Sequence, residues 1–457
     1  MDLSDRERRM THAEGLVREL ADRGVVAVAT SFVDNAGISR VKSVPLDRLP
    51  ALAAWGVGFS TAFDYFRFDD WVAAPPGGQA PVGDQRILPD LDRLVVLAAQ
   101  PGWAWAPGER YAQTGDPYPL DSRLLLTRLT RELAGRGISA LAAIEIEWVV
   151  SSSGEEYVPA APGPAYGLAR LANASDYCRD VLTALDAQGV KVEQFHPEYA
   201  PGQFEVSVAA RDPLAAADTL VFVRTQMRFA ARRHGLQVSF APTAIAGEVG
   251  NGCHAHLSAW RDGANLMQGG DGPAGTTTEG AAAVAGVLEA LPGLLAVLAP
   301  SPAAYLRLQP HHWAGAYACW GVENREAALR FIPGTVTSRE RSANFEVKVG
   351  DGGANPYLVM ALLVAAAADG VERGLAPPEP IQDDPSTLGQ EELERRAITR
   401  LPTTLAEATD LFEGSDLARR VLGDVLHRAF AAVRRREWET HGGLGEQELS
   451  DAYRWCY

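Results

Sequence analysis

Four segments of the chain place polar residues at every second position, and this alternation restricts the fold more than any other feature of the sequence. In "AIEIEWVV" the carboxylates of Glu145 and Glu147 share one face of an expected strand, and apolar residues form the other. The segments "CHAHLSAW", "NFEVKVGD" and "GQFEVSV" repeat the pattern, with polar faces made of His254, His256, Ser258, Glu346, Lys348, Glu205 and Ser207. These segments predict a sheet with one strongly polar face.

Any one of these strands can simply turn its polar face to solvent, as half-exposed antiparallel strands do. Four of them in one region favour a shared polar cavity instead. Carboxylates held close together repel one another unless a cation lies among them, and hard divalent cations prefer oxygen ligands. The segment "VEQFHPEYAPGQFEV" adds Glu193, His196 and Glu198, and its Pro-Gly pair predicts a turn that brings Glu198 close to Glu205. We therefore expect a metal site on this sheet.

Three arginines follow the polar strands or lie between them: Arg307 in "AAYLRLQP", and Arg325 and Arg330 in "NREAALRFIPG". Each one alone is typical of a surface ion pair, but arginines beside a metal cluster suit the recognition of carboxylate and phosphate. Together with the glycines of "GNGCHAHLSAW", which begin at Gly250, they indicate ATP-dependent activation of a carboxylate. Neither a P-loop nor a Rossmann fold is expected to hold the nucleotide, and no nucleophile elbow of a hydrolase is recognisable.

A length of 457 residues predicts two domains. Residues 11–24 read as a helix that ends at a glycine, residues 25–33 as a strand, and short strand patterns continue to about residue 106. After "YAQTGDPYPLDSR" the pattern changes to helices, such as 123–135 and 213–235, which alternate with strands. We expect an α+β protein with a small β-rich domain at 11–110 and a large α+β domain at 117–457.

The charge and the cysteines exclude several classes of protein. The chain carries 42 Lys and Arg against 58 Asp and Glu, a net charge of −16 without a basic block, so we expect neither nucleic acid nor a membrane surface as a partner. The four cysteines lie far apart, which is typical of a reducing cytoplasm. The charged start MDLSDRERRM does not resemble a signal peptide, and the apolar stretch 357–368 is too short to span a bilayer. A cytoplasmic protein is expected.

Five motifs in order carry a resemblance to a known family: EIE at 145–147, HPEYAPGQFE at 196–205, GNGCHAHLS at 250–258, NREAALRFIP at 324–333 and GDGGANPYL at 350–358. The sequence resembles glutamine synthetase of the bacterial type I class over nearly the whole chain. This resemblance implies an N-terminal β-grasp domain and a large catalytic domain with a curved antiparallel sheet. It also implies a homo-dodecamer with active sites between neighbouring subunits.

The resemblance also implies roles for individual residues. Glu147, Glu198 and Glu205 match the ligands of a first metal ion, and Glu145, His254 and Glu346 match those of a second, with two or three Mg²⁺ or Mn²⁺ ions expected in all. Glu193, His256, Ser258, Arg325 and Arg330 match positions that contact ATP. Gly250 and Arg307 match the glutamate site, where Lys348 replaces an arginine, and Arg307 and Arg325 are expected to act in catalysis.

Two departures from the family pattern concern the nitrogen substrate. Glutamine synthetase uses carboxylates to bind and deprotonate ammonium. In "RLQPHHW", Trp313 stands where the family has a glutamate, and in "GFSTAFDYF", Ser60 stands where a looser alignment expects an aspartate. An indole and the aromatics Phe63, Tyr65 and Phe66, which follow Ser60 in the sequence, suit an amine that carries carbon, although Phe63 and Phe66 are equally typical of a core. Asp64, Asp69 or Asp70 remain alternatives for a replacement charge.

These departures predict an ATP-dependent ligase that joins the γ-carboxylate of glutamate to a primary amine through a γ-glutamyl phosphate. Ethanolamine is the first expectation for the amine and polyamines are the second. The alternatives are a true glutamine synthetase that uses ammonium and a non-catalytic oligomer built on the same fold. All six predicted metal-ligand positions hold Glu or His, which argues against the non-catalytic alternative.

Overall fold

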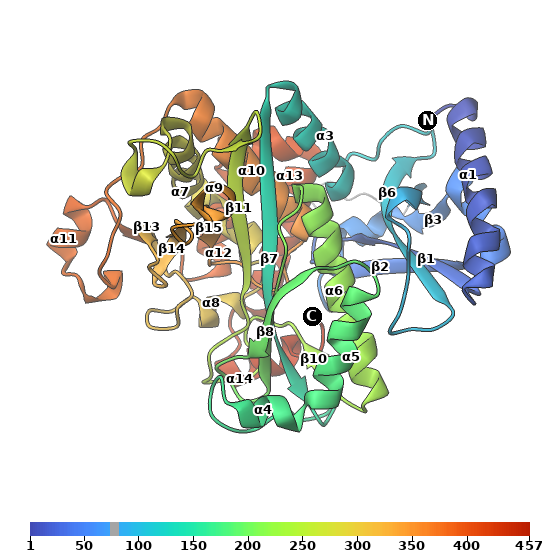
Figure 1. Cartoon of the computed structure of the whole chain (residues 1–457), viewed down its shortest axis with the longest axis horizontal. Helices are drawn as coiled ribbons and strands as arrows, with labels where there is room; N and C mark the ends of the chain where they lie inside the picture. Colours follow the sequence, from blue (N-terminus) through green and yellow to red (C-terminus); the bar gives the residue numbers. More distant parts are fainter. Residues whose placement is uncertain (74–81) are drawn as a thin grey trace.

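The computed structural model describes residues 1–73 and 82–457, so most of the Pro/Gly-rich segment 73–84 lies outside the described residues. Two sheets organise the described part of the chain, and they lie side by side along the longest axis (Figure 1). The N-terminal sheet has six strands and the C-terminal sheet has ten. Helices pack beside both, which gives the expected α+β fold.

The helices are α1 Leu3–Asp22, α2 Leu49–Trp55, α3 Ser122–Gly135, α4 Leu168–Asn173, α5 Ser175–Asp186, α6 Pro213–Arg233, α7 Thr278–Leu298, α8 Ala304–Arg307, α9 Arg339–Ser342, α10 Pro356–Arg373, α11 Gln390–Arg395, α12 Leu405–Glu413, α13 Asp416–His441 and α14 Glu446–Tyr453. The strands are β1 Ala27–Val33, β2 Ser39–Pro45, β3 Val57–Ser60, β4 Asp84–Pro89, β5 Val95–Val96, β6 Trp103–Ala112, β7 Ile138–Ser151, β8 Val192–Pro197, β9 Gln203–Val208, β10 Gln237–Ser239, β11 Cys253–Arg261, β12 Ala264–Asn265, β13 Tyr317–Val322, β14 Ala327–Ile332, β15 Asn344–Val347 and β16 Thr399–Arg400. Short 3-10 turns connect some of them, among them Thr61–Tyr65 and Pro385–Thr387.

The C-terminal sheet brings the alternating segments together. Its strands run in the order β16-β13-β14-β15-β11-β7-β9-β8, with β10 beside β7 and β12 beside β11. The register places Glu145 opposite His254, Glu147 opposite Glu205, and His256 opposite Glu346. The apolar face of β7, with Ile144, Ile146 and Trp148, is buried against α3 and α6, and α10 packs against both of these helices. Because side chains alternate along each strand, burial of this face leaves the carboxylates and imidazoles on the other.

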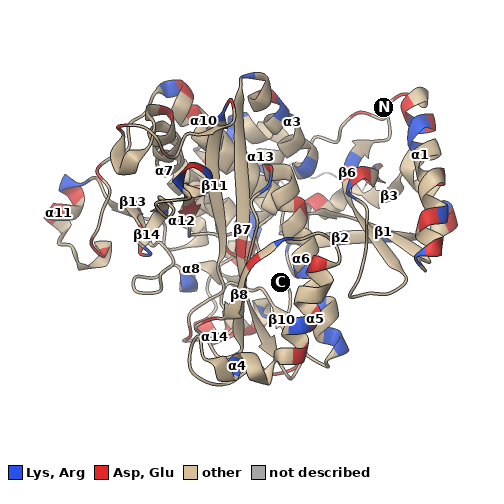
Figure 2. Cartoon of the chain, in the orientation of Figure 1, with Lys and Arg blue, Asp and Glu red and all other residues tan. Residues whose placement is uncertain are grey.

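The N-terminal sheet runs in the order β2-β1-β6-β4-β3, with β1 parallel to β6 and antiparallel to β2. Helix α1 begins at Leu3, eight residues before the predicted start, because Asp2 caps it with a hydrogen bond of 2.8 Å from the backbone N–H of Asp5. Acidic and basic residues are interspersed along α1 (Figure 2), whereas α11 carries Glu391 and Glu392 in its first turn and Arg395 in its last. The domain division at 11–110 and 117–457 stays a prediction.

Helix α7 contains an apolar stretch that the sequence analysis overlooked. Thr278–Leu298 has a mean hydropathy of 2.0 over an 18-residue window and is long enough to cross a membrane, which the stretch 357–368 is not. The protein itself buries 72% of that window. Helix α7 packs against α10 and α12, so its hydrophobic surface forms part of the core rather than a free membrane-binding face.

Glycines allow α7 and α10 to approach closely behind the sheet. A Cβ atom at Gly286 would collide with the carbonyl oxygen of Ala366 and would lie 2.7 Å from the Cα atom of Gly370. A Cβ atom at Gly15 of α1 would meet nothing within 4 Å. Both positions are helical, so they differ in packing and hardly in backbone preference.

We therefore expect Gly286→Ala to destabilise the protein by about 2 kcal/mol, since the helices must separate, whereas Gly15→Ala should stabilise it by roughly 0.5 kcal/mol. Thermal unfolding measures both effects: the midpoint should fall in Gly286→Ala and should stay the same or rise in Gly15→Ala. Equal midpoints for the two variants would contradict the tight α7–α10 contact.

Candidate active site

A cavity of about 600 Å³ opens on the polar face of the C-terminal sheet. Its walls come from β7, β8, β9, β11, β14 and the loops around them, which lie far apart in the sequence. Among the residues assigned roles from the sequence, it is lined by Glu145, Glu147, Glu198, Glu205, Gly250, His254, His256, Arg307, Trp313, Arg325, Arg330 and Lys348. The cavity is thus the polar site that the alternating strands predict.

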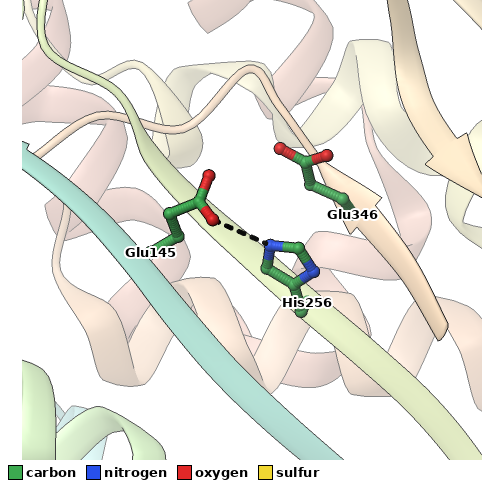
Figure 3. Close-up of side chains that lie close together, drawn as sticks. All are labelled: Glu145, His256 and Glu346. Atoms are coloured by element: carbon green, nitrogen blue, oxygen red, sulfur yellow. Dashed lines mark ion pairs between the residues drawn. The ribbon is translucent and has the colours of Figure 1, made fainter. Parts of the chain in front are cut away.

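One group of ligand-type side chains lies across β7, β11 and β15. The Nδ1 atom of His254 lies 3.0 Å from a Glu145 oxygen and 3.2 Å from a Glu346 oxygen. Figure 3 shows Glu145 and Glu346 on either side of His256, whose Nε2 atom is 3.9 Å from Glu145. This His256 Nε2 atom is buried and has no hydrogen-bond partner, while its Nδ1 atom contacts Asn344 at 3.0 Å. A buried imidazole nitrogen without a partner indicates that a bound group completes the site.

A second group lies across β7, β9 and the turn after β8. Glu147 accepts hydrogen bonds from the backbone N–H of Gly252 at 2.9 Å and from the Gln203 amide at 3.0 Å. Glu205 pairs with His196 at 3.0 Å. Ligand atoms of His196, Glu198 and Glu205 lie within 4.8 Å of one another, as do those of Glu145, Glu205 and His254. The predicted division into two metal triads stays a prediction, because the geometry also allows sets that include His196 and His256.

The pKa shifts show how unfavourable this crowding is without a cation. Burial, reinforced by the neighbouring charges of Glu205 and Glu198, raises the pKa of Glu147 to about 8. Burial, together with Glu145 and Glu198, raises the pKa of Glu205 to about 7. Burial, helped by the charge of Lys348, lowers the pKa of His254 to about 4, so this imidazole is neutral at pH 7. Glu147 and Glu205 thus resist ionising together, whereas the pKa values of Glu145 and Glu346 are lowered by neighbouring groups that include His254. Such carboxylates around a neutral imidazole form a donor set that fits divalent metal ions.

Arg307 and Gly250 form the wall beside this cluster. Arg307 is buried and donates to the carbonyl oxygen of Lys348 at 3.0 Å, and the same nitrogen lies 3.2 Å from Nε2 of His254. A Cβ atom at Gly250 would collide with the carbonyl oxygen of Pro242 and lie 2.9 Å from Arg307 Cγ. The glycine at 250 is therefore required by packing against Arg307, in addition to any approach by a substrate. Lys348 is also buried and contacts Glu346 at 3.1 Å.

Four residues assigned roles from the sequence do not line the cavity: Glu346, which is buried beside His254 and Lys348, and three others. Glu193 is half exposed and pairs with Lys191 at 2.8 Å, because an irregularity in register between residues 192 and 194 of β8 interrupts the alternation. Ser258 lies further along β11 and accepts a hydrogen bond of 2.8 Å from the Trp260 indole. Ser60 lies in the N-terminal sheet, where it caps the turn Thr61–Tyr65. The proposed contacts of these last three with ATP and the amine stay predictions.

Conversely, the cavity contains residues to which the sequence analysis gave no role. Gln203 belongs to this set, and His196, which the sequence analysis grouped with the polar strands, was not assigned to a metal triad. Both precede a predicted ligand by two positions. Tyr166 hydrogen-bonds Glu198 from the loop before α4, and Tyr199 lies in the turn after β8. Loop residues such as these have no periodicity that could have indicated their position.

Trp313 forms the outer wall of the cavity. Its side chain is about half exposed, and its ring lies edge-on to Tyr199 at a centroid distance of 5.9 Å. The aromatic rings Phe63 and Phe66 of the N-terminal sheet instead pack with Phe59 and with Arg40. Asp64 is buried with Arg110 and Tyr118, so it cannot replace the missing charge in this cavity.

Comparison with known proteins assigns this arrangement to a family. Residues 119–450 match the catalytic domain of glutamine synthetase. The chain belongs to the glutamine synthetase family. It is 51% identical over 449 residues to the gamma-glutamylpolyamine synthetase GlnA3 of Streptomyces coelicolor, with 97% of this chain and 96% of that protein covered. It is 32% identical over 348 residues to the glutamine synthetase of Thermus thermophilus, with 75% and 77% covered.

Solved structures agree with this assignment. A crystal structure of a glutamine synthase homologue superposes with a TM-score of 0.84 at 33% identity, covering 95% of this chain and 99% of the other. A ligand-free structure of GmaS superposes with a TM-score of 0.83 at 28% identity, covering 95% and 98%. The expected family and fold class are therefore confirmed, and the protein is a ligase of this family.

The carboxylate crowding generates a testable expectation for metal binding. Without metal, Glu147 must either ionise beside other carboxylates or bind a proton, and both cost folding free energy. Glu147→Gln removes this cost, so it should raise the thermal midpoint in the presence of a chelator. It should also weaken Mn²⁺ binding by about tenfold or more, measured as the Mn²⁺ concentration that raises the midpoint half-way. Glu193→Gln is the matched control, because Glu193 lies outside the cavity and should leave the Mn²⁺ response unchanged. Unaltered Mn²⁺ affinity in Glu147→Gln would contradict this interpretation.

Proposed function

We propose that the protein is an ATP-dependent ligase that joins the γ-carboxylate of L-glutamate to a primary amine, and that the amine is a polyamine. The observation that carries this proposal is the indole of Trp313 on the cavity wall, at the position where the family pattern has the glutamate of the ammonium site. The 51% identity to a gamma-glutamylpolyamine synthetase supports the polyamine and makes ethanolamine, the first expectation from the sequence, the second candidate.

The nitrogen substrate has to be bound as a cation and attack as a free amine. An ammonium site needs carboxylates to offset the loss of hydration, and Trp313 and Ser60 supply none. An indole can hold an alkylammonium group through its ring face and also covers the apolar carbons of the substrate. This combination favours an amine with a carbon chain over ammonium.

The carboxylate cluster would hold two or three Mg²⁺ or Mn²⁺ ions, which neutralise phosphate charge when bound. The triads proposed for them are Glu147, Glu198 and Glu205, and Glu145, His254 and Glu346. For ATP we propose contacts with Glu193, His256, Ser258, Arg325 and Arg330. The exposed guanidinium of Arg325 and the ion-paired guanidinium of Arg330 lie on the cavity wall, where they can stabilise the charge of a phosphoryl group in transfer.

The reaction would proceed in two transfers. A glutamate oxygen attacks the terminal phosphorus of ATP, and the bond to the ADP oxygen breaks. The amine nitrogen then attacks the γ-carbonyl carbon, a C–N bond forms, and the C–O bond to phosphate breaks, while the nitrogen releases a proton to solvent. Arg307 and Gly250 are proposed to hold the glutamate, with Lys348 beside them. Arg307 contacts Nε2 of His254, which belongs to the second proposed metal triad. This contact would fix the position of the bound glutamate relative to that metal ion.

A dodecamer with active sites between subunits belongs to the same proposal. Ser60 does not line the cavity of its own chain, and the family arrangement would place it at the site of a neighbouring subunit. The reducing cytoplasm remains the expected compartment, in keeping with four free cysteines, three of which are buried.

The amine is tested by phosphate release with glutamate, ATP and Mg²⁺ across putrescine, spermidine, ethanolamine, alkylamines and ammonium. We expect the largest kcat/KM for a polyamine and a value at least about tenfold lower for ammonium, since the carboxylates of an ammonium site are missing. A kcat/KM for ammonium equal to that for any amine would mean that the protein is a true glutamine synthetase. Phosphate release with none of these substrates would favour the non-catalytic alternative.

The role of Trp313 is tested by a pair of variants. Trp313→Glu restores the carboxylate of the family pattern and should raise the ratio of ammonium to polyamine kcat/KM by about tenfold or more. Trp313→Phe keeps an aromatic face and should change this ratio by less than about threefold. The KM values for ATP and glutamate serve as internal controls and should stay near wild type. An unchanged ratio in Trp313→Glu would show that the amine is selected elsewhere.

A further inference from the structure

We propose that Glu326 and Asp384 are positioning residues that hold the turn His311–Trp313 in a left-handed conformation and thereby keep Trp313 on the cavity wall. This inference rests on the proposed function, in which Trp313 contacts the amine. Neither carboxylate lines the cavity itself, so the proposal concerns the backbone of the turn rather than a direct contact with substrate.

The turn has an unfavourable backbone. His311 has a φ of 64° and Trp313 a φ of 52°, and both are non-glycine residues in the left-handed region. Side chains with a Cβ atom rarely adopt this conformation, and a bulky residue such as tryptophan is a clear exception. Two such residues within three positions persist only where surrounding contacts hold them.

Those contacts come from the two carboxylates. The backbone N–H of Trp313 donates to the Glu326 carboxylate at 3.3 Å, and Nδ1 of His311 lies 3.2 Å from the Asp384 carboxylate. Burial and the nearby Asp384 raise the pKa of Glu326, whereas the backbone N–H groups of Trp313 and His311 favour its ionised form. One carboxylate therefore acts on each left-handed residue of the turn.

The carboxylates are themselves fixed to the sheet. Glu326 directly precedes β14, and its backbone N–H donates to the Asn324 side chain at 3.0 Å. The same Asn324 side chain donates to the carbonyl oxygens of Ile381 and Asp383 at 3.0 Å, which ties the segment before Asp384 to this point. Asp384 is further held by hydrogen bonds from the backbone N–H and hydroxyl of Ser386, at 2.8 and 2.7 Å. The start of β14, an inner strand of the sheet, thus determines the conformation of the turn.

On the cavity side, the turn determines where the indole lies. Trp313 contacts Tyr199 edge-on, and Tyr199 directly follows Glu198 of the proposed first metal triad. If the turn relaxed to a right-handed backbone, the Cα–Cβ bond of Trp313 would point in another direction and this contact would break. The amine would lose one wall of its site, while the residues proposed for ATP and glutamate would stay in place.

The proposal is tested by Glu326→Ala, Glu326→Gln and Asp384→Ala, with Asp383→Ala as the matched control and Trp313→Ala as the reference. Initial rates give KM for putrescine, butylamine, glutamate and ATP. We expect Glu326→Ala and Asp384→Ala to raise KM for both amines by about tenfold, because the strained turn is released, and to leave KM for glutamate and ATP within about twofold. Glu326→Gln retains an oxygen acceptor for the Trp313 N–H and should stay within about threefold of wild type.

Each outcome decides between the roles. In one outcome, the KM for putrescine, which has a charged tail, rises equally in Glu326→Gln and Glu326→Ala while the KM for butylamine stays unchanged. That result would mean that Glu326 binds the amine by charge, and it would overturn the positioning role. Unchanged amine KM in both alanine variants, with a raised value in Trp313→Ala, would overturn this inference and leave the proposed function intact. Unchanged amine KM in Trp313→Ala would overturn both. If Glu326→Ala fails to fold, Asp384→Ala still tests the turn through its contact with His311. Glu326→Gln tests it with the oxygen acceptor for the Trp313 N–H retained.

Discussion

The crowding of buried carboxylates on one face of the C-terminal sheet is the constraint on which the rest of the structure depends. Strand register alone places Glu145, Glu147, Glu205 and Glu346 around His254, on β7, β9, β15 and β11. Like charges in a poorly solvated site are costly, and the raised pKa values of Glu147 and Glu205 express that cost. A fold can keep such a cluster only if apolar packing elsewhere stabilises the sheet and if bound protons or cations neutralise part of the charge.

The apolar side of the sheet provides the packing. Trp148, on the opposite face of β7 from Glu147, is fully buried and contacts Phe204 and Phe240. Helices α7 and α10 approach one another closely through Gly286 and Gly370, and α10 also packs against α3 and α6 behind the sheet. The polar site is thus built on rigid strands, which hold ligand atoms to within tenths of an ångström more reliably than loops do. The same rigidity explains why Gly250 and Gly252 have no room for a Cβ atom beside Arg307 and Glu147.

The alternation of residues in the sequence was sufficient to predict this sheet and most of its ligand-type side chains. Period two places Glu145 with Glu147 and His254 with His256 whatever their partners are, because side-chain direction in a regular strand depends only on position. The alternation gave a wrong position for Glu193, because irregular pairing in β8 breaks the period. It could not predict Tyr166, which contacts Glu198 from a loop. The start of α1 was misplaced because the capping role of Asp2 outweighed the weak amphipathic pattern of the first turns. Long-range pairing and loop conformation depend on the whole chain, and one local segment does not contain them.

In the function proposed above, the turn His311–Trp313 separates two tasks that a single rigid site would couple. Activation of the glutamate carboxylate needs metal-ligand and phosphate contacts that tolerate little change, and these lie on strands. Selection of the nitrogen substrate needs a surface that can differ among enzymes with the same chemistry, and here it lies on a turn between α8 and β13. Replacing a carboxylate by an indole at such a turn changes which amine fits and leaves the metal cluster untouched. The left-handed conformation of the turn adds a second requirement, since an aromatic residue there acts only when neighbouring groups hold its backbone. Under the proposed function, substrate choice would therefore depend on residues such as Glu326 that do not line the cavity, as well as on Trp313, which does.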